Sequence, residues 1–572
     1  MKSGTKQLQR SAIFLCALLL LAAANAHGQS ISAESPKLIL QITVDQLRGD
    51  MPASVYDRLG KGGFRYLYEN GVVYENAHHR HANTETVVGH ATLATGADPA
   101  DHGMVGNIWF DKELGRLVYN IEDDRYTLVG EGGGVDKDVE MDPTQKVAGT
   151  DGRSPASILS TTFSDELALR TNGKAKIFGV SVKDRGAVPM AGHAGKAFWF
   201  SKAKGEFVTS TYYYDTYPEW VKEWNGKKLP LAYADTNWDL MHDKSTYTYG
   251  DFDDMPWETN LPGFGVVFPH PFGKAEGRLF TSLLTCSPAG DRLTLEFAKA
   301  LLVGEELGQD EVPDYLSVSF SSTDYIGHIF GPASLESEDN LLRLDKTLSE
   351  LLAFVDERVG LEHTLIVLSA DHGAAEAPAQ LNEFGIDARV FEPDKLDKEE
   401  AIETLKAQYG IAEELILGFN HPYVYLNHEI LRERQLDADE VSRTIASVLT
   451  TLEGIAYAVP NIDLVEGKMP DTRLYRQILR NFNPKRSGDI YLVLEPQWFV
   501  ADFDGLTVTS THGSPWRYDT FVPVIFAGNG LAAKTVFREV QTVDIALTLA
   551  KYLRIKAPSG ATGAPLTEVL SQ

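Results

Sequence analysis

The chain is organised around the segment His81-Ala-Asn-Thr-Glu-Thr-Val-Val-Gly-His90, which continues through Ala91-Thr-Leu-Ala-Thr95-Gly96 to Gly106-Asn107. Within this segment, Thr86 stands where a polar loop gives way to a run of small residues that is compatible with a helix. A hydroxyl at a helix N-terminus faces backbone N–H groups without helical partners and the positive end of the helix dipole, which favours anions and a nascent alkoxide. A lone threonine in this place is usually only a helix cap, so the rest of the chain must decide whether Thr86 is catalytic.

Five apolar, β-branched runs outside this segment predict buried strands. We expect parallel strands at Leu38–Val44, Ala175–Val182, Tyr315–Phe320, Thr364–Leu368 and Phe521–Phe526. Helical patterns alternate with them at Pro155–Arg170, Asp339–Val359 and Thr542–Leu553. This alternation predicts an α/β fold with a mainly parallel central sheet and helices on both of its faces.

Two stretches depart from the alternating pattern. Residues from about 187 to 290 are rich in Trp and Tyr and predict a long surface insertion packed over the sheet. Residues from about 380 to 510 predict a small inserted α+β lid. The signals within the lid are helices at Lys398–Gln408 and Ala438–Leu452, and strands at Tyr423–Leu426, Ala456–Val459 and Asp489–Leu494.

The N-terminus, residues 1–26, is typical of a secretory signal peptide. It has a basic start with Lys2, Lys6 and Arg10, an apolar run from Ala12 to Ala23, and a small-residue cleavage site at residues 24–26. The apolar run is too short for a comfortable membrane span. We therefore expect cleavage, bacterial export to the periplasm or the medium, a catalytic domain over 27–572, and no stable membrane association afterwards.

The overall charge limits the partners of the chain. The formal net charge of −27 becomes about −30 once the three basic residues of the signal are removed. This acidity argues against nucleic acid as a partner. An anionic substrate must instead be attracted by local positive charge, because exposed charges beyond about 10 Å are screened. Cys286 is the only cysteine left after cleavage, so no intrachain disulfide is expected.

Polar residues follow the predicted strands at the edge where open α/β sheets place their sites. They are Asp45, Asp324-Tyr-Ile-Gly-His328, Asp371-His372-Gly373 and Thr511-His512-Gly513. Each motif alone is often a turn or a helix cap. Together, three Asp and three His predict a site for two metal ions, and mixed carboxylate and imidazole ligands suit zinc. An additional structural Ca²⁺ in an acidic loop remains an open alternative.

These motifs resemble, in order, the two-zinc site of the alkaline phosphatase superfamily. The context Thr-x-Thr-x-x-Gly-His, followed by Gly106-Asn107 and Lys183-Asp184-Arg185, is similar to single-chain bacterial alkaline phosphatases that have a threonine nucleophile. These enzymes are related to nucleotide pyrophosphatases/phosphodiesterases. The resemblance extends over essentially the whole mature chain, including the segment Val543-Asp544-Ile545-Ala546.

The resemblance implies a role for each of these residues. Thr86 would be the nucleophile and would share one Zn²⁺ with Asp45, Asp371 and His372, while Asp324, His328 and His512 would bind the second Zn²⁺. Asn107, Lys183 and Arg185 would hold the phosphoryl oxygens. The implied activity is hydrolysis of small phosphate monoesters through a phosphothreonine intermediate, and we expect a monomer.

Other functions stay open at this point. A nucleotide pyrophosphatase/phosphodiesterase would use the same metals and threonine, although Lys183 and Arg185 supply more cation than a singly charged diester needs. A sulfatase would need a maturation motif ending in Arg, but the segment Cys286-Ser-Pro-Ala-Gly290 ends in Gly. A secreted metal- or glycan-binding protein would use the Trp-rich insertion. We expect His90 and His102 to be structural, and assign no role to His193 or to the pair at 78–79.

Overall fold

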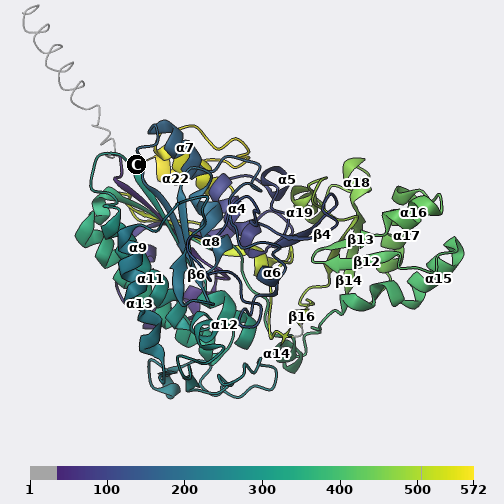
Figure 1. Ribbon diagram of the computed structural model, residues 1–572, viewed down its shortest axis with the longest axis horizontal. Coiled ribbons are helices and arrows are strands. Elements are labelled where there is room, and N and C mark those ends of the chain that lie inside the picture. Colours follow the sequence, from purple (N-terminus) through teal and green to yellow (C-terminus); the bar gives the residue numbers. More distant parts are fainter. Residues whose placement is uncertain (1–34, 501, 504–505, 572) are drawn as a thin grey trace, which may run out of the picture.

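The computed structural model describes residues 35–500, 502–503 and 506–571, so the expected signal peptide lies outside the described residues. Its centre is a ten-stranded sheet in the order β19-β2-β18-β11-β1-β10-β5-β6-β7, with β20 paired to β2 (Figure 1). The strands are β1 (Leu38–Val44), β2 (Val72–His78), β5 (Ile177–Ser181), β6 (Lys196–Ser201), β7 (Glu206–Val208), β10 (Asp314–Phe320), β11 (Thr364–Ser369), β18 (Phe521–Gly528), β19 (Lys534–Val536) and β20 (Val540–Gln541).

The middle of this sheet confirms the predicted α/β fold. β1 lies between β10 and β11 and runs parallel to both, with Val44 opposite Phe320 and Thr43 opposite Ser369. Every residue of β1 is buried, which is why the strand appears in the sequence as an unbroken apolar run. This register brings the carboxyl ends of the three strands to one edge.

The direction of β18 differs from the prediction. It pairs antiparallel with β11 and with β2, so the sheet is mixed rather than wholly parallel. A buried strand is apolar on both faces whichever way it runs. Strand direction follows from the path of the preceding chain, which the apolar pattern does not encode.

Helices pack on both faces of the sheet, and β1 shows how the faces divide. Leu38, Leu40, Ile42 and Val44 face one core, formed with α11 and α13, whereas Ile39 faces the other, formed with α7 and α21 (Figure 1). The main helices are α4 (Thr86–Thr95), α7 (Phe163–Arg170), α8 (Asp184–Ala191), α11 (Pro288–Gly304), α12 (Ser322–Phe330), α13 (Leu335–Arg358) and α21 (Asp544–Tyr552).

Two helices begin away from the predicted residue, and their caps explain why. α7 starts at Phe163 rather than Pro155, because Thr162 and Asp165 form a reciprocal capping box. α13 starts at Leu335, ahead of the expected Asp339, because the Ser334 side chain accepts from the backbone of Ser337.

The Trp-rich insertion begins later in the chain than expected. The segment from 187 to 208 contributes β6 and β7 to the central sheet, with Trp199 on β6. After β7, α9 (Glu219–Gly226) brings Trp220 and Trp224 against Phe297 of α11, with ring centroids 5.2 Å apart in each pair. The aromatic residues of this part therefore fill a core beside the sheet.

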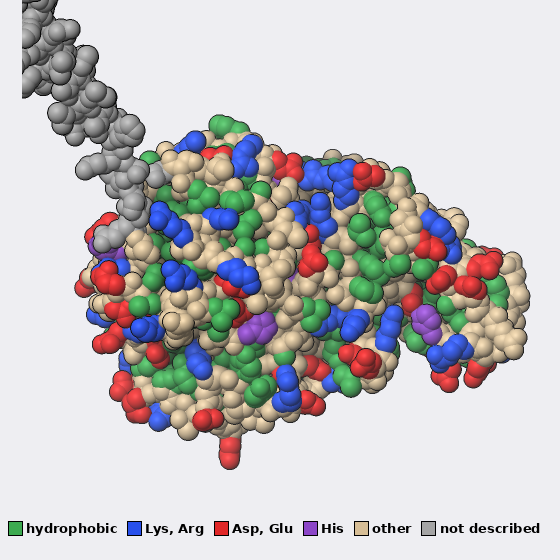
Figure 2. Space-filling model, turned by 90° about the horizontal axis from the view of Figure 1, so that it is seen from above, with side chains coloured by type: hydrophobic (Ala, Val, Ile, Leu, Met, Phe, Trp, Pro, Cys, Tyr) green, Lys and Arg blue, Asp and Glu red, His purple; other side chains and the backbone are tan. Residues whose placement is uncertain are grey.

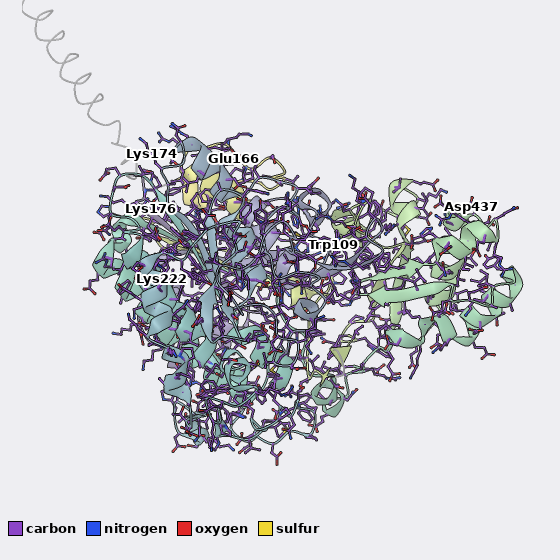
Figure 3. The ribbon with its side chains drawn as sticks, in the orientation of Figure 1. Trp109, Glu166, Lys174, Lys176, Lys222 and Asp437 are labelled. Atoms are coloured by element: carbon purple, nitrogen blue, oxygen red, sulfur yellow. The ribbon has the colours of Figure 1, made fainter. Side chains whose placement is uncertain are left out.

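A second, antiparallel sheet has the order β12-β13-β15-β14 and lies at the far end of the molecule (Figure 1). Its strands are β12 (Ile416–Asn420), β13 (Tyr423–Leu426), β14 (Ile455–Pro460) and β15 (Ile490–Leu494), and its helices include α15 (Glu400–Tyr409), α17 (Ala438–Leu449) and α19 (Arg473–Asn481). Strand β12 was not predicted; Gly418 interrupts its apolar residues, and Leu417 is exposed. Asp437, which caps α17, marks the outer tip of this part (Figure 3).

The small sheet is attached to the main body through a shared apolar core. Tyr423 and Tyr491 of the small sheet pack in one cluster with Val87 and Val88 of α4 and with Trp109. Trp109 lies on β3 (Ile108–Asp111), on the side of the main body that faces the small sheet (Figure 3). This core places the small sheet beside the helix that carries Thr86.

Charged side chains of both signs are interspersed on the face drawn in Figure 2, with apolar side chains between them. None of the helices in the described ranges combines the length and the apolar character that a membrane span needs.

Candidate active site

Thr86 is the first residue of α4, as the sequence predicted. The helix lies so close to the end of β11 that a Cβ on Gly89 would be only 2.0 Å from the Asp371 carbonyl oxygen. Only glycine permits this approach. Gly89 therefore brings the start of α4 next to Asp371.

Asp45, Asp371 and His372 converge beside this helix from the ends of β1 and β11. His372 Nε2 lies 3.4 Å from Asp45 Oδ1 and 3.5 Å from Asp371 Oδ2, and the three side chains are fully buried. Their ligand atoms are close enough to one another to surround one metal ion.

Asp324, His328 and His512 form the neighbouring group. Asp324 and His328 are one helical turn apart on α12, and Asp324 Oδ1 lies 3.2 Å from His328 Nε2 and 3.4 Å from His512 Nε2. The His372 ring stacks on the His512 ring at 3.5 Å, so the two groups adjoin. The second set of atoms that lie close enough together to surround one metal ion consists of Asp324, His512 and the shared His372, in place of the expected His328.

Backbone carbonyl groups orient all three imidazoles in the same way. The Nδ1 atoms of His328, His372 and His512 lie 2.8, 3.0 and 2.8 Å from the carbonyl oxygens of Ser510, Gly373 and Thr84. This contact favours a proton on Nδ1 and leaves Nε2 with a lone pair, which is how a metal-binding histidine is usually held.

The unsatisfied atoms of the site fit a metal ion. The buried atoms that make no hydrogen bond within the described residues include Thr86 Oγ1, Asp45 Oδ1, Asp371 Oδ2 and His372 Nε2. A buried polar atom without a partner is costly. One ion with oxygen and nitrogen ligands would satisfy all four together.

Lys183 lies between the two groups. Its ammonium is 2.8 Å from Asp45 Oδ2, pairs with Asp324 Oδ2, and sits 4.8 Å from the ring centre of Tyr325. Lys183 is fully buried and precedes α8 as its N-cap residue. A buried ammonium in contact with both groups is placed to meet an anion that bridges them.

Arg185 and Asn107 complete the polar wall. Arg185 is 4% exposed, and its Nη1 pairs with Asp142 while Nε has no hydrogen-bond partner among the described residues. Asn107 Oδ1 accepts from the Val87 backbone N–H at 3.0 Å, which leaves its amide NH₂ as the donor to the site. Asp184, between the two cations in sequence, turns away and pairs with Arg153 at 2.6 Å.

The pKa values of these side chains reflect this crowding. Burial and Asp324 raise the pKa of Asp45, but Lys183 and His372 outweigh them and hold it below the usual value. Burial lowers the pKa of His512 to about 3. Burial lowers the pKa of His372 as well, but Asp371 and Asp45 raise it to about 9. Burial and the neighbouring Asp45 raise the pKa of Asp371, so these side chains lie close enough to shift one another's pKa.

A cavity of about 1010 Å³ opens beside these residues, between the main body and the part that carries the small sheet. The main body contributes Glu85, Asn107, Asp142, Arg185, Asp324, His328 and His512, and the facing wall contributes Phe391, Phe419, His421, Tyr491 and Trp498. The wall that holds the candidate metal ligands thus faces a wall that contains several aromatic side chains.

The structure brings every predicted site residue to this region, together with some that the sequence did not reveal. Gln46 follows Asp45 in the left-handed region (φ 66°) and donates to Asp324 at 3.0 Å and to Asp371 at 3.2 Å. His90, for which no partner was expected, lies 3.2 Å from Asp371 Oδ2 and 2.9 Å from Ser319 Oγ. The position of Gln46 directly after a strand was the one available signal.

Comparisons with known proteins agree with this geometry. The family model for type I phosphodiesterase/nucleotide pyrophosphatase matches residues 39–515. The chain is 35% identical to a Myroides odoratus protein named calcium-transporting ATPase, over 94% of this chain and 95% of that protein. It is 34% identical to alkaline phosphatase PafA of Elizabethkingia meningoseptica, with the same coverage of both chains.

Solved structures give the same relationship. The crystal structure of wild-type alkaline phosphatase PafA superposes with a TM-score of 0.85 at 33% identity, covering 94% of this chain and 99% of that one. A second structure is that of a PafA mutant altered at a threonine, an asparagine, a lysine and an arginine.

Proposed function

The chain belongs to the type I phosphodiesterase/nucleotide pyrophosphatase family within the alkaline phosphatase superfamily and is an alkaline phosphatase family hydrolase. We propose that it is an exported, zinc-dependent phosphate monoesterase that acts through a phosphothreonine. The observation that carries the monoester assignment is the presence of two buried cations, Lys183 and Arg185, beside two groups of candidate metal ligands. A monoester dianion presents more charge to such cations than a diester does.

The residues would hold two zinc ions. Asp45, Asp371 and His372 would bind one, together with Thr86, while Asp324, His328 and His512 would bind the other. Zinc bound there would supply a lowered pKa for the threonine hydroxyl and electrostatic stabilisation of the leaving oxygen. This ligand set combines imidazole nitrogens and carboxylate oxygens, which suits zinc better than magnesium.

The chain's own groups perform the displacement. Thr86 Oγ forms a bond to phosphorus as the bond from phosphorus to the leaving oxygen breaks, and the alcohol departs on the opposite side. Water then attacks the phosphothreonine, releasing inorganic phosphate and restoring the hydroxyl. The proton of the Thr86 hydroxyl goes to the departing alcohol, and a proton from the attacking water restores the hydroxyl as phosphate leaves.

Three donors hold the phosphoryl oxygens through both steps. Asn107 donates from its amide, because its carbonyl oxygen is occupied by Val87. Arg185 offers the free Nε edge of its guanidinium. With Asp45 and Asp324 committed to metal ions, the Lys183 ammonium is available to a phosphoryl oxygen.

The altered residues of the PafA mutant support these roles. They are of the same four types as Thr86, Asn107, Lys183 and Arg185. The threonine and asparagine are 21 positions apart in both chains, and the lysine and arginine are two positions apart in both.

A phosphodiesterase is the second candidate. It is favoured by the description of the matching family model and by the size of the cavity, about 1010 Å³, which would admit substituents on two sides of a phosphate. The decisive experiment measures hydrolysis of an aryl phosphate monoester and of the matching diester, each with and without added zinc. We expect the monoester to have the higher kcat/KM; a higher value for the diester would reverse the assignment.

Export is tested separately from catalysis. The basic and apolar N-terminal segments predict cleavage after residue 26. N-terminal sequencing of the protein purified from the periplasm or the medium should begin at His27, and an intact Met1 would contradict the signal peptide.

A further inference from the structure

Asp142 is a buried acid that none of the steps above uses. It is 6% exposed, and its Oδ2 pairs with Arg185 Nη1. Its other oxygen, Oδ1, accepts from the Thr144 backbone N–H at 2.9 Å and from the Thr144 hydroxyl at 2.6 Å, as the N-cap of α6 (Pro143–Lys146). Both oxygens are therefore engaged, and the carboxylate cannot rotate freely.

The backbone beneath Asp142 is anchored as well. Glu140 Oε1 accepts from the backbone N–H groups of Met141 and Asp142, each at 2.9 Å, and Glu140 pairs with Lys202. The Ser282 hydroxyl donates to the Val139 carbonyl. A loop held at so many points presents Asp142 in one place.

This placement has a consequence for the substrate. A carboxylate next to Arg185 reduces the positive charge that a phosphoryl dianion meets, so by charge alone it disfavours binding. The fixed orientation of Arg185 compensates for this loss of attraction. An arginine held through Nη1 keeps its Nε edge in one direction. Arg185 Nε is a buried donor that has no hydrogen-bond partner within the described part of the chain.

We propose that Asp142 is a positioning residue, which fixes the Arg185 guanidinium so that its Nε edge meets the phosphoryl group. The inference rests on the proposed monoesterase function. Asp184, the other acid near Arg185, cannot take this role, because Arg153 and Tyr119 hold its carboxylate at 2.6 and 2.5 Å.

Asp142→Asn tests the proposal, because it keeps the side-chain shape and an acceptor for the cap but removes the charge. With Arg185 present, we expect the monoester kcat/KM to fall by about 10-fold or more, the scale on which misplaced catalytic groups lose rate. Competitive inhibition by inorganic phosphate should weaken in parallel, and diester hydrolysis should fall less.

The same substitution in an Arg185→Ala background gives the sharper result. There Asp142 is an unpaired buried carboxylate that repels the dianion, so Asp142→Asn should leave kcat/KM unchanged or raise it. If Asp142 only supported the fold, Asp142→Asn would lower the monoester kcat/KM by the same factor in both backgrounds. That outcome would overturn the proposal. If Asp142→Asn does not fold, Asp142→Glu, which shifts the charge, gives the same comparison.

Asp98→Asn is the matched control. It breaks the ion pair between the buried Asp98 and Arg80, and Asp98 contacts neither Asp142 nor Arg185, so any loss should be equal for monoester and diester and equal in both backgrounds. If Arg185→Ala itself leaves monoester hydrolysis unchanged, both the phosphoryl role of Arg185 and this inference fail. If Arg185→Ala is strongly impaired but Asp142→Asn is not, the proposed function stands and only the inference is wrong.

Discussion

At the scale of single residues, the proposed chemistry depends on buried polar atoms that have no hydrogen-bond partner within the described residues. The Thr86 hydroxyl is fully buried and makes no hydrogen bond within the described residues. Such an atom costs stability unless a ligand satisfies it. Its position at the start of α4, beside Asp45 and Asp371, makes it the nucleophile that we expect.

Replacement of Thr86 separates the nucleophile from the metal site. Thr86→Ala should remove most activity while leaving the fold and most of the zinc in place, because the Asp and His ligands remain. Thr86→Ser should keep a substantial fraction of the rate, since it retains the hydroxyl. Activity, zinc content and Tm are measured together; near-wild-type turnover by Thr86→Ala would exclude covalent catalysis here and make Thr84 the next candidate.

We expect Lys183 and Arg185 to determine, by their charge, the preference for monoesters over diesters. Each changed to Ala should lower the monoester kcat/KM by about 2–4 kcal/mol, the range for loss of a preorganised donor to an oxyanion. Diester hydrolysis should fall much less, because a diester presents less charge. The monoester/diester ratio should therefore collapse, whereas equal losses on both substrates would return the phosphodiesterase to contention.

At the scale of elements, the N-terminus of α7 shows how a buried acid caps a helix and also holds a histidine. Asp165 completes the capping box with Thr162 and also accepts from His193 Nδ1 at 2.7 Å, while His193 Nε2 lies 3.2 Å from the Ile158 carbonyl oxygen. Both ring nitrogens face acceptors, which favours the protonated ring. The hydrogen bond with Asp165 accordingly raises the pKa of His193.

This raised pKa predicts how stability depends on pH. The stabilisation is complete below the ordinary histidine pKa of about 6.5 and is lost as pH rises through the higher pKa of the folded state. The Tm difference between wild type and His193→Gln should therefore be larger at pH 6 than at pH 9, by about 1–2 °C, since His193 is partly exposed. A difference that does not change with pH would refute the pairing.

At the scale of the whole molecule, the site exists only because distant segments meet. Its acids and imidazoles come from the ends of β1 and β11, from α12 and from the segment before β18. The same region holds like charges close together, with Asp324 acting on Asp45 and Asp45 on Asp371. Metal ions would thus stabilise the assembled fold as well as the reaction.

Removal of the metal tests this coupling. Dialysis against a strong chelator should abolish activity and lower Tm, and zinc should restore both better than magnesium. Asp45→Ala or Asp324→Ala should already show the lower zinc content before dialysis. Elemental analysis that finds no transition metal in active enzyme would refute the two-zinc proposal.

The sequence alone predicts the features that depend on residues close together in the chain. The apolar runs of β1 and β11 and the small residues after Thr86 predict their elements within a residue or so, because burial and helix capping act over short spans. Polar residues at strand ends also predicted which side chains would form the site. Conformations that depend on one or two neighbours are encoded locally.

Features that depend on contacts between segments distant in sequence are seen only in the tertiary structure. The antiparallel course of β18, the close packing of Gly89 on Asp371 and the pairing of Arg185 with Asp142, 43 positions earlier, leave no periodic signal. Before folding, Asp142 is simply an acid in front of a proline, the common pattern of a helix cap. Its second contact exists only because the folded chain brings Asp142 next to Arg185 of α8.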